Sequence, residues 1–185
     1  MVMTVNPQTK TILLTSIPRD SYVTLHSFGA EDKLTHSGIY GVEETVDTVE
    51  DWLDYDMNYY IKANFSMLVD IVDAIDGVDV YSDFEFKSSV ADFYYNEGEN
   101  HLSGMAALYF ARERKAFEDE DIERGRNQQK VLKAMINKTT QSKVILTKYT
   151  QLLDAVEDEM QTNMSEKDIS SLVKMQINDM GKWTI

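Results

Sequence analysis

The five arginines of this chain occupy two short segments, and arginine is the side chain best suited to hold an anion there. Four of them fall within fifteen residues: Arg112, Arg114, Arg124 and Arg126. The fifth, Arg19, lies in the turn-like segment Ile17-Pro18-Arg19-Asp20 after an apolar stretch. Arginine presents a planar fork of donors that matches carboxylate and phosphate oxygens, whereas lysine is a point charge. Because the thirteen lysines are scattered along the chain, this distribution favours an oxyanion site built from arginine.

Spacing within the second segment indicates what such a site would hold. Arg112 and Arg114 are two residues apart, so on an extended segment both side chains point the same way. Arg124 and Gln128 are four apart and would share one helix face. Asp121, one turn before Arg124, is placed to cap that helix or to hold an arginine fork. Converging guanidinium groups and an amide suit a multiply charged group such as a diphosphate, whose transfer depends on positioning and charge stabilisation.

Neighbouring acids leave a second interpretation open. The same segment contains six carboxylates: Glu113, Glu118, Asp119, Glu120, Asp121 and Glu123. Arginines paired with them would form an ordinary solvated ion-pair surface. The spacing alone does not decide between this surface and an anion site.

Other kinds of active site find little support in the sequence. There is no GxxxxGK[ST] or GxGxxG phosphate loop. The three histidines have no HExxH context and are more typical of packing or surface residues than of zinc ligands: His26, His36 and His101. No serine lies in a G-x-S-x-G elbow, and the chain has no cysteine. Nucleotide-fold, zinc and thiol chemistries are therefore not indicated.

Composition indicates one folded domain that does not bind nucleic acid. The chain has 185 residues, of which 43% are hydrophobic and 10% aromatic, enough for a core. Its 18 Lys and Arg face 32 Asp and Glu, giving a formal net charge of −14. That charge repels a phosphate backbone, so nucleic acid is not an expected partner. No run approaches the roughly 20 apolar residues that span a bilayer.

Hydrophobic patterning predicts an α/β fold, a three-layer α-β-α arrangement in which helices flank a central mixed β-sheet. Strands are expected over 1–5 and 10–17, joined by a turn at Asn6-Pro7-Gln8-Thr9, with the second strand buried on both faces. A strand over 59–65, a helix from Ser66 as N-cap to residue 75 and a strand over 78–81 form a βαβ-sized unit. The other expected elements are a helix over 31–53 that Gly38 and Gly41 could break, a hairpin or loop over 83–100, helices over 102–110, 124–138, 142–160 and 166–179, and a short strand over 183–185.

Several separated motifs then follow one another in a specific order. They are Ser16-Ile17-Pro18-Arg19-Asp20, Asp32-Lys33-Leu34-Thr35-His36-Ser37-Gly38, Asp76-Gly77-Val78-Asp79-Val80, Leu102-Ser103-Gly104-Met105-Ala106-Ala107-Leu108, Ala111-Arg112-Glu113-Arg114, Asp121, and Arg124-Gly125-Arg126-Asn127-Gln128-Gln129. Together they resemble the LytR–CpsA–Psr family of cell-envelope phosphotransferases. The resemblance runs from residue 1 to about residue 140.

This resemblance implies an enzyme at the outer face of the Gram-positive cell membrane. The family moves a glycopolymer, such as teichoic acid or capsular polysaccharide, from a polyprenyl-diphosphate carrier onto peptidoglycan. Carried over by motif, six residues would bind the diphosphate: Arg19, Lys33, Arg112, Arg114, Arg124 and Gln128. Of these, Arg19 and Arg124 would act in catalysis together with Asp121, a supporting or proton-handling carboxylate. The lipid tail would lie in a hydrophobic tunnel between sheet and helices.

The resemblance also implies Mg²⁺, which the family holds with aspartates that precede the segment beginning at Met1. We therefore expect 1–185 to be a single catalytic domain truncated at its N-terminus, without the metal ligands, the first strands and the membrane anchor. Such a fragment would be weakly active or inactive. Two alternatives stay open: an envelope protein that binds polyprenyl phosphate without turnover, and a transcription-attenuator type of regulator. The net charge and the lack of a helix-turn-helix pattern argue against direct DNA contact by the latter.

Overall fold

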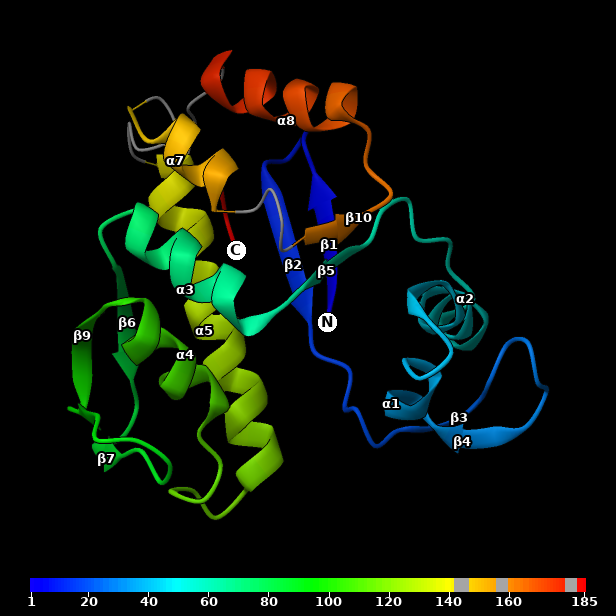
Figure 1. Cartoon of the computed structure of the whole chain (residues 1–185), viewed down its shortest axis with the longest axis horizontal. Helices are drawn as coiled ribbons and strands as arrows, with labels where there is room; N and C mark the ends of the chain where they lie inside the picture. The colour runs from blue at the N-terminus through cyan, green and yellow to red at the C-terminus, as the bar shows by residue number, and fades with distance from the viewer. Residues whose placement is uncertain (142–146, 156–159, 179–182) are drawn as a thin grey trace.

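A computed structural model describes residues 1–141, 147–155, 160–178 and 183–185 (Figure 1). The chain opens with an antiparallel hairpin of β1 (Val2–Asn6) and β2 (Thr11–Thr15). The side chain of Asn6 accepts hydrogen bonds from the backbone N–H groups of Gln8 and Thr9, which closes the predicted turn. Both strands and their turn are thus confirmed.

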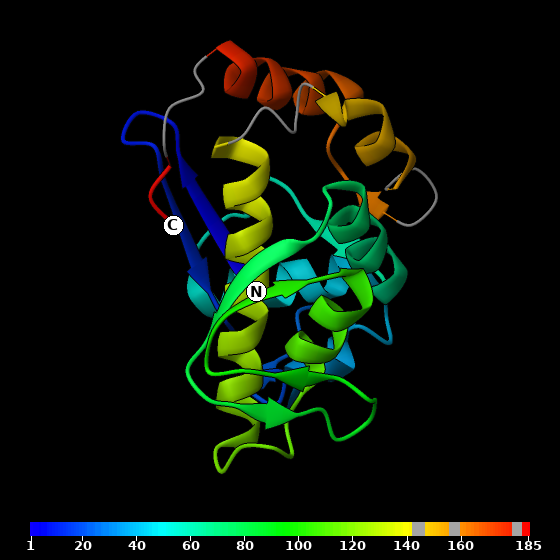
Figure 2. The same cartoon turned by 90° about the vertical axis from the view of Figure 1, so that its left-hand side faces the viewer.

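The prediction that the second strand is buried on both faces is wrong. Leu13 is 63% exposed, while Ile12 and Leu14 on the opposite face are half-buried. The reason is that helix α5 (Glu120–Gln141) covers only one face of the hairpin, where the Gln129 amide donates to the Leu14 carbonyl at 3.2 Å. Figure 2 shows the hairpin lying along this helix.

The expected helix over 31–53 is divided into a strand and two helices. β3 (Tyr22–Thr24) pairs antiparallel with β4 (Glu31–Lys33), which leads into α1 (Leu34–Ser37) and then α2 (Val42–Leu53). The break falls at the glycines, where Gly41 adopts φ 123°, a conformation that L side chains rarely adopt. The hydroxyl of Ser37 donates to the hydroxyl of Thr45 and ties α1 to α2.

The elements over 59–82 exist as predicted, but their strands do not share a ladder. β5 (Ile61–Ala63), α3 (Phe65–Ala74) and β6 (Val78–Ser82) follow in order. β5 pairs with β10 (Met160–Thr162), whereas β6 pairs with β9 (Gly98–Leu102). The N-cap of α3 is Asn64 rather than Ser66, since the Asn64 side chain accepts from the Met67 N–H at 2.8 Å.

The main hydrophobic core lies where α3, α4 (Gly104–Arg112) and α5 pack against β6 and β9. A short hairpin of β7 (Phe86–Lys87) and β8 (Tyr94–Tyr95) adds aromatic side chains to it, as expected for 83–100. α3 and α4 approach closely at Gly104. A Cβ added there would lie 2.3 Å from the Val69 carbonyl oxygen. α5 begins four residues before the predicted helix over 124–138 and so includes Asp121.

After α5, the structure differs from the prediction at residue 160, where a strand begins within the predicted helix. The predicted helix over 142–160 lies partly outside the described residues; within them, α7 (Tyr149–Asp154) is helical and Met160 begins β10. α8 (Glu166–Asn178) matches the next predicted helix. At the C-terminus, Thr184 forms a parallel bridge with Thr11.

The α/β class is confirmed, although the described strands do not form one continuous sheet. They pair as five two-stranded antiparallel ladders, so the expected central mixed β-sheet is divided. Strands of two to five residues make few ladder hydrogen bonds, and helices pack on the β6–β9 and β3–β4 pairs. In the ranges that the structure describes, we find no helix with the length and apolarity needed to cross a bilayer.

Candidate anion-binding site

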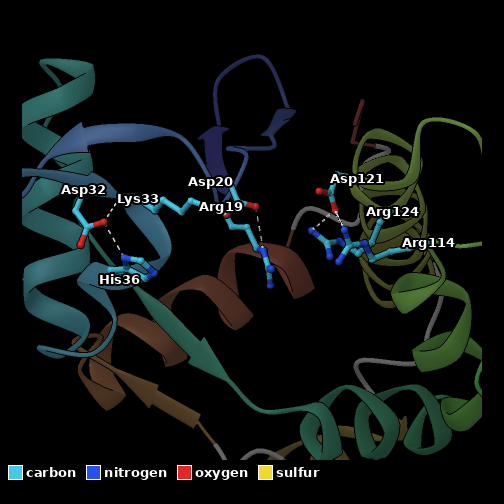
Figure 3. Close-up of polar contacts among 8 residues, drawn as sticks. All are labelled: Arg19, Asp20, Asp32, Lys33, His36, Arg114, Asp121 and Arg124. Carbon is cyan, nitrogen blue, oxygen red and sulfur yellow. Dashed lines mark hydrogen bonds and ion pairs between the residues drawn. The ribbon is translucent and has the colours of Figure 1, made fainter.

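Two arginines from different elements meet on one carboxylate at the start of α5. The Oδ1 atom of Asp121 lies 3.0 Å from a terminal guanidinium nitrogen of Arg124 and 3.0 Å from one of Arg114 (Figure 3). Asp121 is inside the first turn of α5, so it holds arginine forks and is not the N-cap. The i,i+3 spacing from Asp121 to Arg124 is local, whereas Arg114 arrives from the segment after α4.

A buried carboxylate fixes the segment that carries Arg114. Glu113 is only 1% exposed and accepts hydrogen bonds from the backbone N–H groups of Ser89, Arg114 and Ala116. Burial raises the pKa of Glu113, but these hydrogen bonds outweigh it and hold the pKa below its ordinary value. The Arg114 Nε–H is buried without a hydrogen-bond partner among the described residues.

A second cationic group forms on the loop after β2. Asp20 lies between Arg19 and Lys33, with one carboxylate oxygen 3.4 Å from Arg19 Nε and the other 2.9 Å from Lys33 Nζ. The hydrogen bond from Lys33 is the main cause that lowers the pKa of Asp20. Backbone hydrogen bonds from Thr35 N–H to the Arg19 carbonyl, and from Leu34 N–H to the Ser21 carbonyl, hold the two segments together.

The backbone segments that carry the two cationic groups lie side by side, although Arg19 and Arg124 are about 100 residues apart in sequence. A Cβ added to Gly125 would lie 3.8 Å from the hydroxyl oxygen of Ser16. Ser16 comes three residues before Arg19, and Gly125 follows Arg124. In Figure 3 the guanidinium groups of Arg114 and Arg124 point toward the side on which Arg19 lies. The fold therefore brings both arginine segments to one region.

The remaining candidates lie less centrally. The guanidinium of Arg112 lies over the ring of Phe65, with Cζ 4.6 Å from the ring centre. Gln128 is exposed on α5, one turn beyond Arg124. Arg126, also exposed, pairs with Glu123 on its own helix. Pairing with neighbouring acids thus does occur, as the second interpretation expected, and the binding and catalytic roles stay predictions.

The described residues offer no fit for Mg²⁺. Across the described ranges, no three His, Cys, Asp or Glu side chains gather closely enough to hold a metal ion. Each histidine instead contacts one aspartate at the surface: His26 with Asp51, His36 with Asp32, and His101 with Asp79. We therefore assign no step to a metal.

Three contributors were missed by the sequence analysis. Asp20 and Glu113 were both visible as acids adjacent to arginines, and that adjacency was the available signal. Their bridging and burial depend on partners elsewhere in the chain. Phe65 gave no signal, because 47 residues separate it from Arg112.

Comparisons with known proteins place the chain in a family. The model of the LytR_cpsA_psr family matches residues 1–182. The polyisoprenyl-teichoic acid–peptidoglycan teichoic acid transferase TagU of Bacillus licheniformis is 38% identical over 168 residues, which are 90% of this chain and 54% of that protein. TagU of Bacillus subtilis is 38% identical over 88% of this chain and 53% of its own length. The chain thus spans about half the length of the curated relatives it matches.

Solved structures show the same similarity in three dimensions. B. subtilis TagV superposes with a TM-score of 0.80 and 30% identity, over 98% of this chain and 72% of that one. A structure described as TagT bound to LI-WTA gives a TM-score of 0.75 and 32% identity, over 94% of this chain and 66% of that one. From the family match and these relatives, the chain belongs to the LytR_cpsA_psr family.

Proposed function

We propose that this chain is the diphosphate-binding part of a transferase that moves a glycopolymer from a polyprenyl-diphosphate carrier onto peptidoglycan. The observation that carries the proposal is the pair Arg114 and Arg124 held on Asp121, with the Arg19 segment packed on the same helix. The relatives named as polyisoprenyl-teichoic acid–peptidoglycan teichoic acid transferases support teichoic acid as the glycopolymer.

The geometry suits an anion with two phosphoryl groups. Arg114 and Arg124 approach from the segment after α4 and from α5, and Arg19 and Lys33 approach from the loop after β2 and from β4. Cations on both sides of a diphosphate would offset its charge. Guanidinium forks bind phosphate oxygens with two parallel hydrogen bonds, which orients the group as well as attracting it.

In the proposed transfer, the oxygen of an acceptor hydroxyl forms a bond to the phosphorus next to the glycopolymer. The bond from that phosphorus to the bridging oxygen breaks, polyprenyl monophosphate leaves, and the proton of the acceptor hydroxyl passes to the leaving phosphate or to water. Negative charge builds up on the phosphoryl oxygens and on the bridging oxygen, and prepositioned arginines stabilise it. Arg19 and Arg124 are our candidates for this role, and Asp121 keeps Arg124 and Arg114 in place.

The proposal includes the outer face of the cell membrane as the place of action and Mg²⁺ as the cofactor, both implied by the family resemblance. A polyprenyl carrier is a membrane lipid, which supports the location. No described residue is assigned to hold Mg²⁺, because no three suitable side chains gather in the described ranges.

Binding and turnover are separated by two measurements on the full chain. Titration calorimetry with farnesyl diphosphate, and with farnesol as the uncharged control, should show binding of the diphosphate alone. Incubation with a polyprenyl-diphosphate-linked teichoic acid and peptidoglycan, with and without Mg²⁺, should release polyprenyl monophosphate slowly or not at all, because residues 1–185 are expected to be weakly active or inactive. Measurable release would refute the lipid-phosphate-binding alternative, and equal affinity for farnesol and farnesyl diphosphate would refute the anion site.

A further inference from the structure

Arg112 is held in place differently from the other arginines. Their guanidinium groups each lie against a carboxylate: Arg19 on Asp20, Arg114 and Arg124 on Asp121, and Arg126 on Glu123. Among the residues that the structure describes, Arg112 has no such ion pair. Its guanidinium carbon lies 4.6 Å from the ring centre of Phe65 instead. Arg112 is therefore oriented without being neutralised.

The backbone determines this contact. Phe65 is the first residue of α3, directly after the capping residue Asn64, and is 59% exposed. Arg112 is the last residue of α4. The close approach of these two helices at Gly104 leaves little freedom in their separation. The ring and the guanidinium are thus presented to each other by two packed helices.

An aromatic ring and a carboxylate differ in how they affect the charge and the N–H donors of an arginine. The ring attracts the cation through its quadrupole and contacts the guanidinium face. The N–H donors lie in the guanidinium plane, so they stay available at its edge. A carboxylate partner occupies those donors and offsets the charge. An incoming anion must compete with Asp121 at Arg114 and Arg124, whereas no carboxylate of the described ranges competes at Arg112.

Arg112 and Arg114 flank a buried carboxylate at the end of α4. Glu113 lies between them with extended backbone, φ −62° and ψ 138°, and its side chain is buried. Arg112 is exposed, and the side chain of Arg114 is 37% exposed. Arg112 therefore lies directly beside the fixed segment that carries Arg114.

From these contacts we propose that Phe65 is a positioning residue that presents Arg112 as an uncompensated cation to the anionic ligand. Phe65 acts through Arg112 and makes no hydrogen bond to the ligand itself. This inference rests on the proposed function, since it takes a diphosphate as the ligand.

The test is titration calorimetry of the full chain with inorganic pyrophosphate at fixed pH and ionic strength. Phe65→Leu keeps an apolar side chain but removes the ring, and should weaken binding about two- to five-fold. Phe65→Trp and Phe65→Tyr keep a ring and should bind like the wild type. In an Arg112→Ala background, Phe65→Leu should cause no further loss. Phe28→Leu, at another exposed phenylalanine whose ring contacts Tyr40 and, among the described residues, no arginine, is the matched control and should leave affinity unchanged.

The outcomes separate this inference from the proposed function. If the wild type does not bind pyrophosphate, the anion site itself is wrong. If Arg112→Ala weakens binding but Phe65→Leu does not, the anion site stands and the role of Phe65 is refuted. Equal loss from Phe65→Leu with and without Arg112 would mean that Phe65 acts through packing, which also overturns the inference. Melting temperatures of all variants show whether a loss reflects unfolding.

Discussion

The two cationic groups of the site are built in contrasting ways. On α5, Asp121 binds Arg124 through local helix spacing, and the Arg124 side chain is only 18% exposed. On the loop after β2, Asp20 joins Arg19 and Lys33, whose side chains are 58% and 51% exposed. The first group is half-buried and braced by Glu113 below it. The second lies in solvent and depends on contacts between the loop after β2 and strand β4.

This difference in exposure indicates which group should contribute more of the binding energy. Charge interactions strengthen as solvent is excluded, while exposed pairs contribute about 0–1 kcal/mol and weaken with salt. The α5 group should therefore supply most of the affinity for an anion, and the Arg19–Lys33 group should adjust it. In both groups one carboxylate lies between two cations, which offsets their mutual repulsion when no anion is bound.

The largest expected effect comes from the α5 group. Arg124→Ala should weaken farnesyl diphosphate binding about ten- to hundred-fold, since hydrogen bonds to charged groups contribute roughly 1.5–3 kcal/mol. Arg126→Ala is the matched control on the same helix, because its exposed side chain pairs with Glu123. Titration calorimetry measures both variants. An equal loss in the two would show that total charge, not the Asp121-centred geometry, governs affinity.

Glu113, which accepts hydrogen bonds from the backbone beside Arg114, should contribute to the stability of the fold. Glu113→Gln should lower the free energy of unfolding by about 1–3 kcal/mol, because an amide cannot accept all three backbone hydrogen bonds. Asp20→Asn, which alters an exposed carboxylate, should change it by less than about 1 kcal/mol. Urea unfolding measures the difference. Equal losses would remove the contrast between the two groups.

The carboxylate of Glu113 also predicts that the stability of the protein falls at acidic pH. Because the folded-state pKa of Glu113 is lowered, its stabilising contribution is present above the unfolded-state pKa and is lost as the pH falls through the folded-state pKa. Unfolding of the wild type in urea at a series of acidic pH values should show this loss. The curve of Glu113→Gln should be flatter over the same range. Parallel curves for the two proteins would contradict the assignment.

The contact between the two groups can be tested at Gly125. A Cβ there would meet Ser16 Oγ at 3.8 Å, an ordinary contact, and alanine is favoured over glycine inside a helix. Gly125→Ala should therefore raise the free energy of unfolding by about 0.5–1 kcal/mol. Thermal and urea unfolding measure the change. Destabilisation would mean that the end of β2 lies closer to α5 than the structure places it.

The smallest effect is expected at the exposed group. Lys33→Ala should weaken farnesyl diphosphate binding about two-fold, and the effect should shrink at high salt. Calorimetry at two ionic strengths measures it. A loss as large as that of Arg124→Ala would reverse the ranking of the two groups.

Much of the fold could be predicted because it depends on neighbours in sequence. The Asn6-Pro7 turn, the helix after Asn64 and the long helix around Val131 all follow from local capping and periodicity. The predictions were wrong where contacts between distant segments determine the burial or pairing of a strand. Leu13 is exposed because only one face of its hairpin meets a helix, and β5 pairs with a strand about 100 residues away.

The sequence by itself determined that arginine is concentrated in two segments, that their order matches one family, and that net charge argues against nucleic acid. Only the tertiary structure decided the partners of Arg112 and Arg114. Six acids were available near Arg114 and Arg124, and the fold placed Asp121 between them. It gave Arg112 an aromatic ring in place of a carboxylate. Spacing limits which partners are within reach, but burial and the packing of α3, α4 and α5 select among them, because those contacts join residues far apart in the chain.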